Sequence, residues 1–204
     1  MFTPLDKRLF PDNNCDVYRI SDDHFVYGIY KNGHSSINAT FEKTPILDIK
    51  KISNVTVYIR DPLDRYVSGV RQYLKDEPGD HPTLLAFIDK FLFINRHFMP
   101  QFFWLLHLAK YTSSNVKISI KHINELHKLT TLRWNQSNII DNLRTRFETN
   151  KQLNFYLLAD DLLYKDLMNK TLPLTEIFTC LKEKNSNLYN EIFLLTKEMA
   201  NVLP

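Results

Sequence analysis

The sequence predicts an α/β domain in which a parallel β-sheet is flanked by helices, with a helix-rich C-terminal half. Two apolar segments, residues 25–30 and 55–60, have the uniformly hydrophobic character of strands buried on both faces. Each runs into a polar turn and then a helical pattern, and this alternation implies parallel strands joined by right-handed crossovers. All four glycines lie before residue 80, so backbone freedom is concentrated in the half that carries these segments.

The chain is expected to begin irregularly. Residues 1–20 contain two prolines and an Asp-Asn-Asn turn, which are typical of a loop. The strand at 25–30 follows. A short helix then begins at Ser35 or Ser36 and ends before Pro45, because a proline disfavours helical backbone in the residue that precedes it.

The second strand, at 55–60, leads into another helix. Asp64 can cap this helix, which is expected to run to about Leu74. Residues 77–82 combine two prolines with glycine and aspartate and therefore predict a loop.

The rest of the chain is mostly helical in pattern. Helices are expected at 83–94 and 100–111, and the alternating segment 115–120 predicts a third strand. Beyond residue 122 the pattern stays mostly helical, with Pro173 as a boundary.

Length and composition set limits on function. A chain of 204 residues suits a single domain, 1–204, with about 171–204 as a helical C-terminal extension. The net charge of +3 comes without a block of like charges, so no nucleic-acid partner is expected. The longest apolar stretch is too short to cross a bilayer and no leader pattern precedes the domain, so a soluble, cytoplasmic protein is expected. Cys15 and Cys180 are predicted to be free thiols, and no cluster has metal-ligand spacing.

The turn after the first strand, Tyr30-Lys-Asn-Gly-His-Ser-Ser36, has the chemistry of an anion site. A strand–turn–helix junction directs several backbone N–H groups and the positive end of the helix dipole at one point. Lys31 adds a full charge, Gly33 permits close approach of the backbone, and two serines add hydroxyl donors. The alternative is an ordinary turn with a lysine facing solvent.

The segment Gly28–Ser35 also nearly matches the triphosphate-binding loop Gly-x-x-x-x-Gly-Lys-Ser/Thr. His34, however, stands where that loop has its lysine, and a neutral imidazole is a poor substitute for a fixed charge. This places ATP or GTP hydrolysis in doubt.

The same turn resembles the first cofactor loop of sulfotransferases that use 3′-phosphoadenosine 5′-phosphosulfate (PAPS), with the pattern Pro-Lys-Thr-Gly-x-Thr-Ser. It is similar at the lysine, the glycine and both hydroxyls. It departs at Tyr30, usually proline, at Asn32, usually threonine, and at His34, usually a small residue. The resemblance implies a P-loop-like fold.

The second loop strengthens the resemblance. Arg60 ends the strand and Ser68 follows eight residues later, in a string Arg-Asp-Pro-x-x-Arg-x-x-Ser. This string is similar, without departure, to the sulfotransferase segment that binds the cofactor's 3′-phosphate. A guanidinium and a hydroxyl could hold one phosphate together. In the alternative interpretation, which can hold beside this one, Asp61 and Asp64 pair with Arg65 at a helix start.

Two weaker similarities follow. Residues 97–101, His-Phe-Met-Pro-Gln, resemble a His-x-x-Pro-Gln string of carbohydrate sulfotransferases. Residues 156–164 resemble a late Tyr-x-x-Asp-x-x-Leu-Tyr/Phe segment of the same group. The connection between the two cofactor loops is much shorter than in most members of that group.

The resemblance implies transfer of a sulfuryl group from PAPS to an acceptor hydroxyl, for example of a carbohydrate, leaving adenosine 3′,5′-bisphosphate. Lys31, with the amides of Asn32–Ser36 (Asn32, Gly33, His34, Ser35 and Ser36), would stabilise charge on the departing 5′-phosphate. Arg60 and Ser68 would hold the 3′-phosphate. No metal is expected.

A base must take the acceptor's proton, and His97, Glu42 and His34 are the candidates in that order. A lone histidine before an aromatic helix is also a common capping or packing residue. Two other functional classes stay open: a nucleotide kinase or hydrolase, and a non-catalytic nucleotide-binding protein on the same frame.

Overall fold

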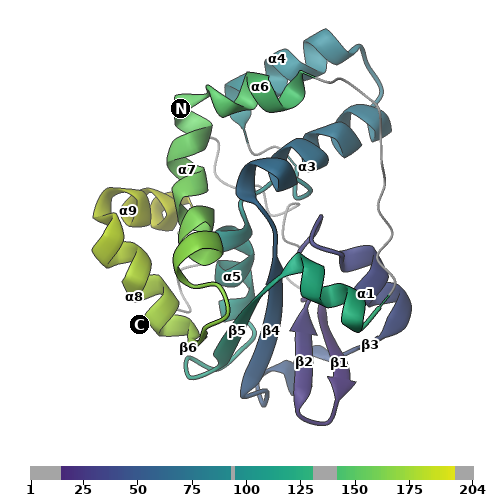
Figure 1. Ribbon diagram of the computed structural model, residues 1–204, viewed down its shortest axis with the longest axis vertical. Coiled ribbons are helices and arrows are strands. Elements are labelled where there is room, and N and C mark those ends of the chain that lie inside the picture. The colour runs from purple at the N-terminus through teal and green to yellow at the C-terminus, as the bar shows by residue number, and fades with distance from the viewer. Residues whose placement is uncertain (1–14, 93–94, 131–141, 196–204) are drawn as a thin grey trace.

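The structure is a computed structural model, which describes residues 15–92, 95–130 and 142–195. A mixed six-stranded sheet with the order β3-β1-β2-β4-β5-β6 lies between helices (Figure 1). The strands are β1 Val17–Ser21, β2 His24–Tyr27, β3 Glu42–Lys43, β4 Asn54–Ile59, β5 Lys117–His122 and β6 Thr171–Pro173. The central strands β2, β4 and β5 are parallel, whereas β1 and β6 run antiparallel to their inner neighbours.

Helices make up most of the remaining described residues. They are α1 His34–Thr40, α2 Ile46–Ile49, α3 Pro62–Asp76, α4 His81–Phe91, α5 Gln101–Ala109, α6 Leu143–Glu148, α7 Lys151–Asp161, α8 Leu174–Lys184 and α9 Ser186–Leu195, with a 3₁₀-helix η1 Ile123–Lys128 and a π-helix η2 Leu162–Asp166.

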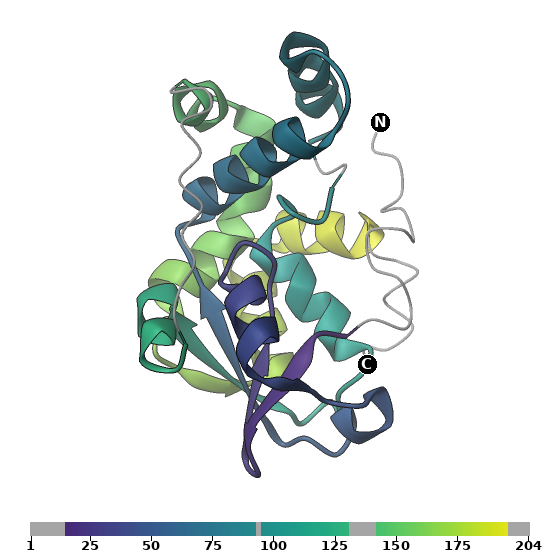
Figure 2. The same ribbon diagram turned by 90° about the vertical axis from the view of Figure 1, so that its right-hand side faces the viewer.

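The sheet is buried on both faces, as the uniformly apolar strands predict. Val26 packs with Ile37 of α1 and Leu126 of η1, whereas the next residue, Tyr27, packs in a larger cluster with α5 and α8. Consecutive strand residues point to opposite faces, so these two clusters lie on opposite sides of the sheet. Figure 2 shows η1 on one side and α5 on the other.

The predicted α/β class is confirmed, but the sheet is mixed and not purely parallel. The predicted strands at 25–30, 55–60 and 115–120 correspond to β2, β4 and β5. The expected irregular start extends too far: β1 occupies part of it, and residues 1–14 lie outside the described chain. The edge strands β3 and β6 have only two and three residues, and β1, beside β3, mixes buried and exposed positions, so these strands carry a weak pattern.

Two helix starts also differ from prediction. Asp61, not Asp64, caps α3 by accepting a hydrogen bond from the Asp64 amide at 2.8 Å. The helix expected from 83 begins at His81, because Asp80 caps it and Pro82 is compatible with the first turn. The C-terminal end of the predicted segment 83–94, at residues 93–94, and part of the helical region after 122 lie outside the described residues.

The C-terminal segment contributes directly to the sheet and core. Residues 171–173 form β6, which pairs with β5, and Pro173 marks the boundary before α8 as expected. Leu174 and Phe178 of α8 and Ile192 of α9 are buried in the larger hydrophobic cluster.

Candidate functional site

The two polar turns leave neighbouring parallel strands at the same edge of the sheet. The first loop, residues 28–33, follows β2, and the second loop, residues 60–61, follows β4. In sheets of this kind ligands bind outside the carboxyl ends of the strands. The α3 helix rises from the second loop above this edge (Figure 1).

The first loop has an unusual backbone. Lys31 and Gly33 both adopt positive φ angles, 68° and 79°. Glycine tolerates this region freely, but a lysine pays a steric cost there. A non-glycine residue held in such a conformation is a reason to suspect function, because the surrounding structure must enforce it.

Two residues of helix α3 hold the first loop in this backbone conformation. Arg65 donates from Nε to the backbone oxygen of Tyr30 at 3.1 Å, and Gln72 accepts from Nζ of Lys31 at 3.1 Å. Ser68 lies between Arg65 and Gln72 on the same face of the helix, since residues three and four apart are neighbours. The structure thereby brings Lys31 and Ser68, one from each predicted motif, to the same region.

Lys31 is half-buried and does not face solvent freely. Burial lowers the pKa of its ammonium to about 8, and the nearby charges of Arg65 and Arg60 lower it further against the opposing effect of Asp76. Removing water and adding like charges both disfavour the protonated form. The lysine is therefore still charged at neutral pH, and a bound anion would stabilise this charged form.

The predicted pairing of Arg65 with Asp61 and Asp64 is wrong. Arg65 is buried, with 1% exposure, and donates to the backbone oxygens of Tyr30 and Met99. Both aspartates instead face Arg144 of α6. A buried guanidinium needs acceptors from several directions, and the carbonyls of two distant loops supply them.

Gln101 joins the two loops. Its side chain accepts from the backbone N–H of Arg60 and donates to the backbone oxygen of Arg60, both at 2.9 Å. Its oxygen also accepts from Nδ2 of Asn32 at 2.6 Å, and Asn32 donates to the backbone oxygen of Tyr58 at 2.8 Å. The side chain of Asn32 therefore links the loops to each other and points into the protein.

Asp160 fixes this connection at the start of α5. Its carboxylate accepts from the backbone N–H groups of Gln101 and Phe102 at 2.6 and 2.7 Å. Complete burial raises the pKa of Asp160 to about 6, against the opposing effects of Arg65 and these hydrogen bonds. The two weak sequence similarities, at 97–101 and 156–164, thus meet in one buried network behind the loops.

The cationic groups near the loops form one electrostatic cluster. Arg60 and Arg65 act on Lys31, and Arg71 acts on Arg60, in each case lowering the pKa of the affected group after burial. Arg71 was not singled out from the sequence, although it lies three residues after Ser68 on α3. Its Nε is buried and has no hydrogen-bond partner among the described residues.

The three predicted bases have different surroundings. His97 lies beside the Tyr30 ring, with ring centroids 5.2 Å apart, and burial together with Lys31 and Arg96 lowers its pKa to about 4. Glu42 is exposed on edge strand β3, opposite Arg19 and separated from β2 by β1.

His34, the third candidate base, begins α1 and packs against the ring of Tyr30. Its ring centroid is 4.3 Å from that of Tyr30, and its Nε2 lies 3.2 Å from Oδ2 of Asp16. Ser35 is exposed and Ser36 is buried in the first turn of α1, where the amides of Ser36 and Ile37 already donate to Gly33.

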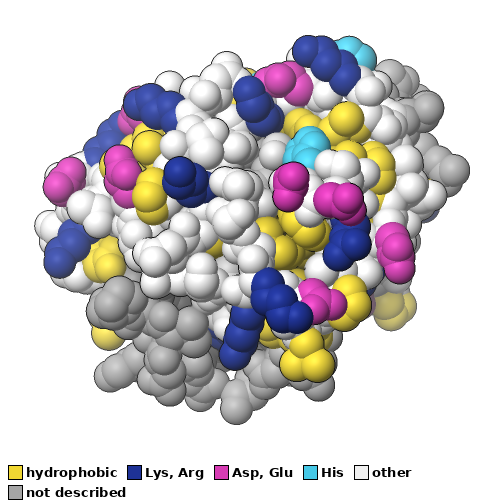
Figure 3. Space-filling model, turned by 90° about the horizontal axis from the view of Figure 1, so that it is seen from below, with side chains coloured by type: hydrophobic (Ala, Val, Ile, Leu, Met, Phe, Trp, Pro, Cys, Tyr) yellow, Lys and Arg dark blue, Asp and Glu magenta, His cyan; other side chains and the backbone are white. Residues whose placement is uncertain are grey.

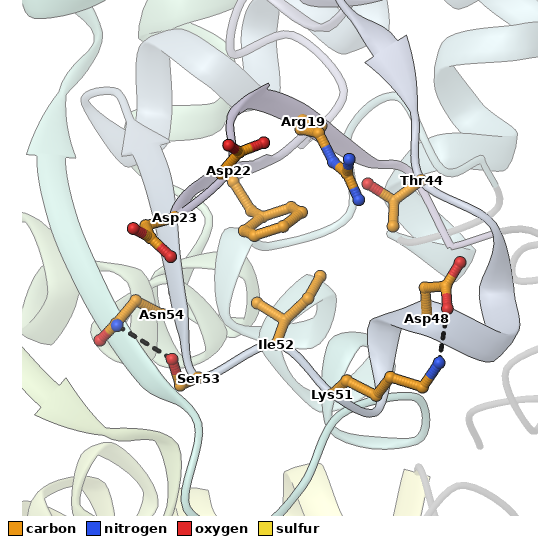
Figure 4. Close-up of a pocket in the computed structure, with 10 residues that line it drawn as sticks. Arg19, Asp22, Asp23, Thr44, Asp48, Lys51, Ile52, Ser53 and Asn54 are labelled. Carbon is orange, nitrogen blue, oxygen red and sulfur yellow. Dashed lines mark hydrogen bonds and ion pairs between the residues drawn. The ribbon is translucent and has the colours of Figure 1, made fainter.

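A pocket also lies at the opposite, amino-terminal edge of the sheet (Figure 4). Its lining residues are Arg19, Asp22, Asp23, Phe25, Thr44, Asp48, Lys51, Ile52, Ser53 and Asn54. Lys51 and Asp48 pair within it at 2.9 Å. On this lower face, acidic and basic side chains are interspersed around hydrophobic ones (Figure 3). Because charges of both signs offset one another there, the carboxyl edge is the better candidate for an anionic ligand.

Other features were sought within the described parts of the chain. No group of three or more His, Cys, Asp or Glu side chains there could hold a metal ion. None of the helices in these parts combines the length and apolar character that a membrane span requires. Cys15 and Cys180 are free. Comparisons with models of known protein families, with curated proteins and with solved structures found no match.

Proposed function

We propose that the protein is a PAPS-dependent sulfotransferase with a P-loop-like arrangement of its two cofactor loops. The observation that carries this proposal is the convergence of Lys31 with Arg60 and Ser68 at one edge of the sheet. Arg60 and Arg65 lie close enough to Lys31 to lower its pKa, so three cations gather at this edge. Such a cluster is stabilised when an anion binds, and charge-assisted hydrogen bonds to phosphate oxygens are among the stronger ones.

The two loops suit two separate phosphate groups. In the proposed complex, Lys31 and the first turn of α1 contact the 5′-phosphosulfate, while Arg60 and Ser68 contact the 3′-phosphate. The acceptor oxygen forms a bond to sulfur as the bond from sulfur to the 5′-phosphate oxygen breaks. The electron pair of that bond stays on the phosphate, and Lys31 stabilises the negative charge that develops there.

The kinase-like alternative fits the described contacts less well. A triphosphate loop needs a cation at position 34, but Nε2 of His34 lies against Asp16 and the hydroxyl of Tyr18, at 3.2 and 3.3 Å. Nε2 of His34 is thus engaged by protein groups and does not supply the cation that such a loop needs. A non-catalytic nucleotide-binding protein shares the cofactor contacts and differs from the proposed enzyme only in turnover.

Binding of adenosine 3′,5′-bisphosphate tests the site. A ligand present at 100 times its dissociation constant adds about 2.7 kcal/mol to stability. We expect a larger rise in melting temperature with the bisphosphate than with AMP, because AMP leaves Arg60 and Ser68 without a phosphate. Ser68→Ala should remove most of this difference, with the exposed Ser186→Ala as control. Equal shifts for the two nucleotides in the unmodified protein would contradict the role of the second loop.

Release of the bisphosphate from PAPS, with water or a panel of sugars as acceptor, then separates the enzyme from the non-catalytic alternative. Strong bisphosphate binding without any release would support the latter.

A further inference from the structure

His34 forms a buried contact with a carboxylate. Its Nε2 lies 3.2 Å from Oδ2 of Asp16, whose side chain is 8% exposed. Lys43 contacts the other oxygen, Oδ1, at 2.7 Å. Burial raises the pKa of Asp16, but the hydrogen bonds from His34 and Lys43 outweigh this and hold the pKa below its usual value. Asp16 is therefore ionised and can only accept hydrogen bonds.

The neighbouring hydroxyl determines which nitrogen of His34 carries the proton. Tyr18 donates its hydroxyl hydrogen to Oδ1 of Asn38 at 3.0 Å, so its oxygen can only accept from Nε2 of His34, 3.3 Å away. An ionised Asp16 also requires a donor at Nε2. Both neighbours place the proton on Nε2, which leaves Nδ1 of the neutral ring as a proton acceptor.

The edge that carries Nδ1 is the one with room to meet a ligand. Cδ2 of His34 packs against Gly28, where an added Cβ would lie only 2.7 Å away, and Nε2 faces Asp16. One ring face lies toward Tyr30. The side chain is nevertheless 18% exposed, and none of these contacts involves the Cε1–Nδ1 edge, so we take this edge as the one that faces a ligand.

The charged surroundings of His34 differ from those of His97, although both rings flank Tyr30. Asp16 faces His34 directly, and Lys43 reaches it only through that carboxylate. His97 faces the cations Lys31 and Arg96. Asp16 orients the ring of His34 through Nε2, whereas burial and the cations lower the pKa of His97 to about 4, so His34 is the better-placed base.

We propose, resting on the sulfotransferase function above, that His34 is the general base and that Asp16 is its positioning residue. As the acceptor oxygen bonds to sulfur, its proton passes to Nδ1 of His34. The positive charge on the ring is then stabilised by Asp16 through Nε2–H, and the proton later leaves to water. This proposal places His34 first among the three candidate bases, where the sequence alone placed His97 first.

A ground-state test does not depend on turnover. Long-range ¹H–¹⁵N spectra of the imidazoles, with His34 assigned by its loss in His34→Gln, should show the Nε2–H form in the neutral ring. In Asp16→Asn the other form, Nδ1–H, should become appreciably populated, because the fixed acceptor is weakened. A neutral ring protonated mainly on Nδ1 in the unmodified protein would overturn the proposal.

Turnover tests the base itself. His34→Gln should lower kcat for bisphosphate release from PAPS by about 10²–10⁴-fold, with the KM for PAPS changed little. Asp16→Asn should lower kcat less than His34→Gln does, because the ring keeps its nitrogen base and loses only its fixed orientation. His24→Gln is the matched control, since His24 is a partly buried histidine at the amino-terminal start of β2, where its Nε2 contacts the hydroxyl of Thr56 away from the proposed site. It should retain full activity.

Imidazole in solution should partly restore kcat in His34→Ala, which a merely structural histidine would not permit. Bisphosphate binding by each variant reports that it is folded. Retained kcat in a folded His34→Gln, or an unmodified protein that binds bisphosphate without any turnover, would overturn the assignment of the base. In the second case the sulfotransferase function fails as well, and the spectra still report whether Asp16 orients the ring.

Discussion

The charge on Lys31 provides a direct test of the proposed cofactor site. Burial and the neighbouring cations lower its pKa to about 8, so raising the pH through 8 removes the charge from the free protein. A bound phosphosulfate or bisphosphate stabilises the ammonium form and therefore raises this pKa. Affinity for adenosine 3′,5′-bisphosphate should consequently fall as pH rises through 8, and binding should take up protons.

The magnitude follows from the titration. With a pKa of about 8, roughly nine tenths of the free lysine is charged at pH 7 and about one tenth at pH 9. If only the charged form binds, the dissociation constant rises about tenfold between these pH values, or about 1.4 kcal/mol. If the pKa in the complex is near the ordinary lysine value of about 10.4, proton uptake is close to half a proton at pH 8.

Calorimetric titration in two buffers with different ionisation heats measures both quantities. Lys31→Arg is the matched control, because arginine keeps its charge throughout this range. Its bisphosphate affinity should be nearly independent of pH between 7 and 9. If the unmodified protein shows the same flat profile with no proton uptake, Lys31 does not contact the bound phosphate as its charged form.

Other substitutions probe the loop and its support. Lys31→Ala should lower sulfate transfer by about 10²–10³-fold while leaving the circular dichroism spectrum unchanged; a folded variant with near-normal activity would exclude Lys31 as the leaving-group cation. Gly69→Ala should lose about 1–3 kcal/mol of stability in a denaturant titration, because a Cβ would lie 2.3 Å from the backbone oxygen of His97; helix propensity alone would give a gain. Asp160→Asn should cost about 1–3 kcal/mol, since an amide cannot accept from both backbone N–H groups in the same way, and unchanged stability would contradict the network. His34→Lys should leave Mg-ATP affinity unchanged by calorimetry, and a clear magnesium-dependent gain would favour the kinase-like function.

The central strands could be predicted because they are buried on both faces and read as continuous apolar runs. The two outer strands on one side of the sheet, β3 at the edge and β1 beside it, could not be predicted. β1 combines buried Val17 and Tyr18 with exposed Arg19, and β3 has only two residues. The pairing of these strands depends on partners elsewhere in the sheet, which periodicity within five residues does not reveal.

The same limit applies to the site. The residues near Lys31 could be singled out by type and spacing, because a cation, a glycine and hydroxyls directly after a strand are typical of an anion-binding turn. The role of Arg65 could not, since its acceptors are backbone oxygens of residues 30 and 99, and any sequence has carbonyls there. The position of Gln101 between the loops is likewise a property of the fold.

The three departures of the first loop from the sulfotransferase pattern each have a specific partner. Tyr30 lies under the guanidinium of Arg96, 4.6 Å from the ring centroid. The amide of Asn32 donates to Gln101, and His34 contacts Asp16.

These partners come from separate parts of the chain, and two of the contacts are buried or partly buried polar ones. A buried polar atom is costly unless it is paired, and Nδ2 of Asn32 and Nε2 of His34 have partners, whereas Oδ1 of Asn32 is buried without one among the described residues. Tyr30 and Asn32 flank Lys31, which has a positive φ angle, so their contacts with Arg96 and Gln101 anchor the loop on both sides of that residue. Under the proposed function we expect these departures to support turnover, and release of adenosine 3′,5′-bisphosphate from PAPS is the measurement that decides between the enzyme and the non-catalytic alternative.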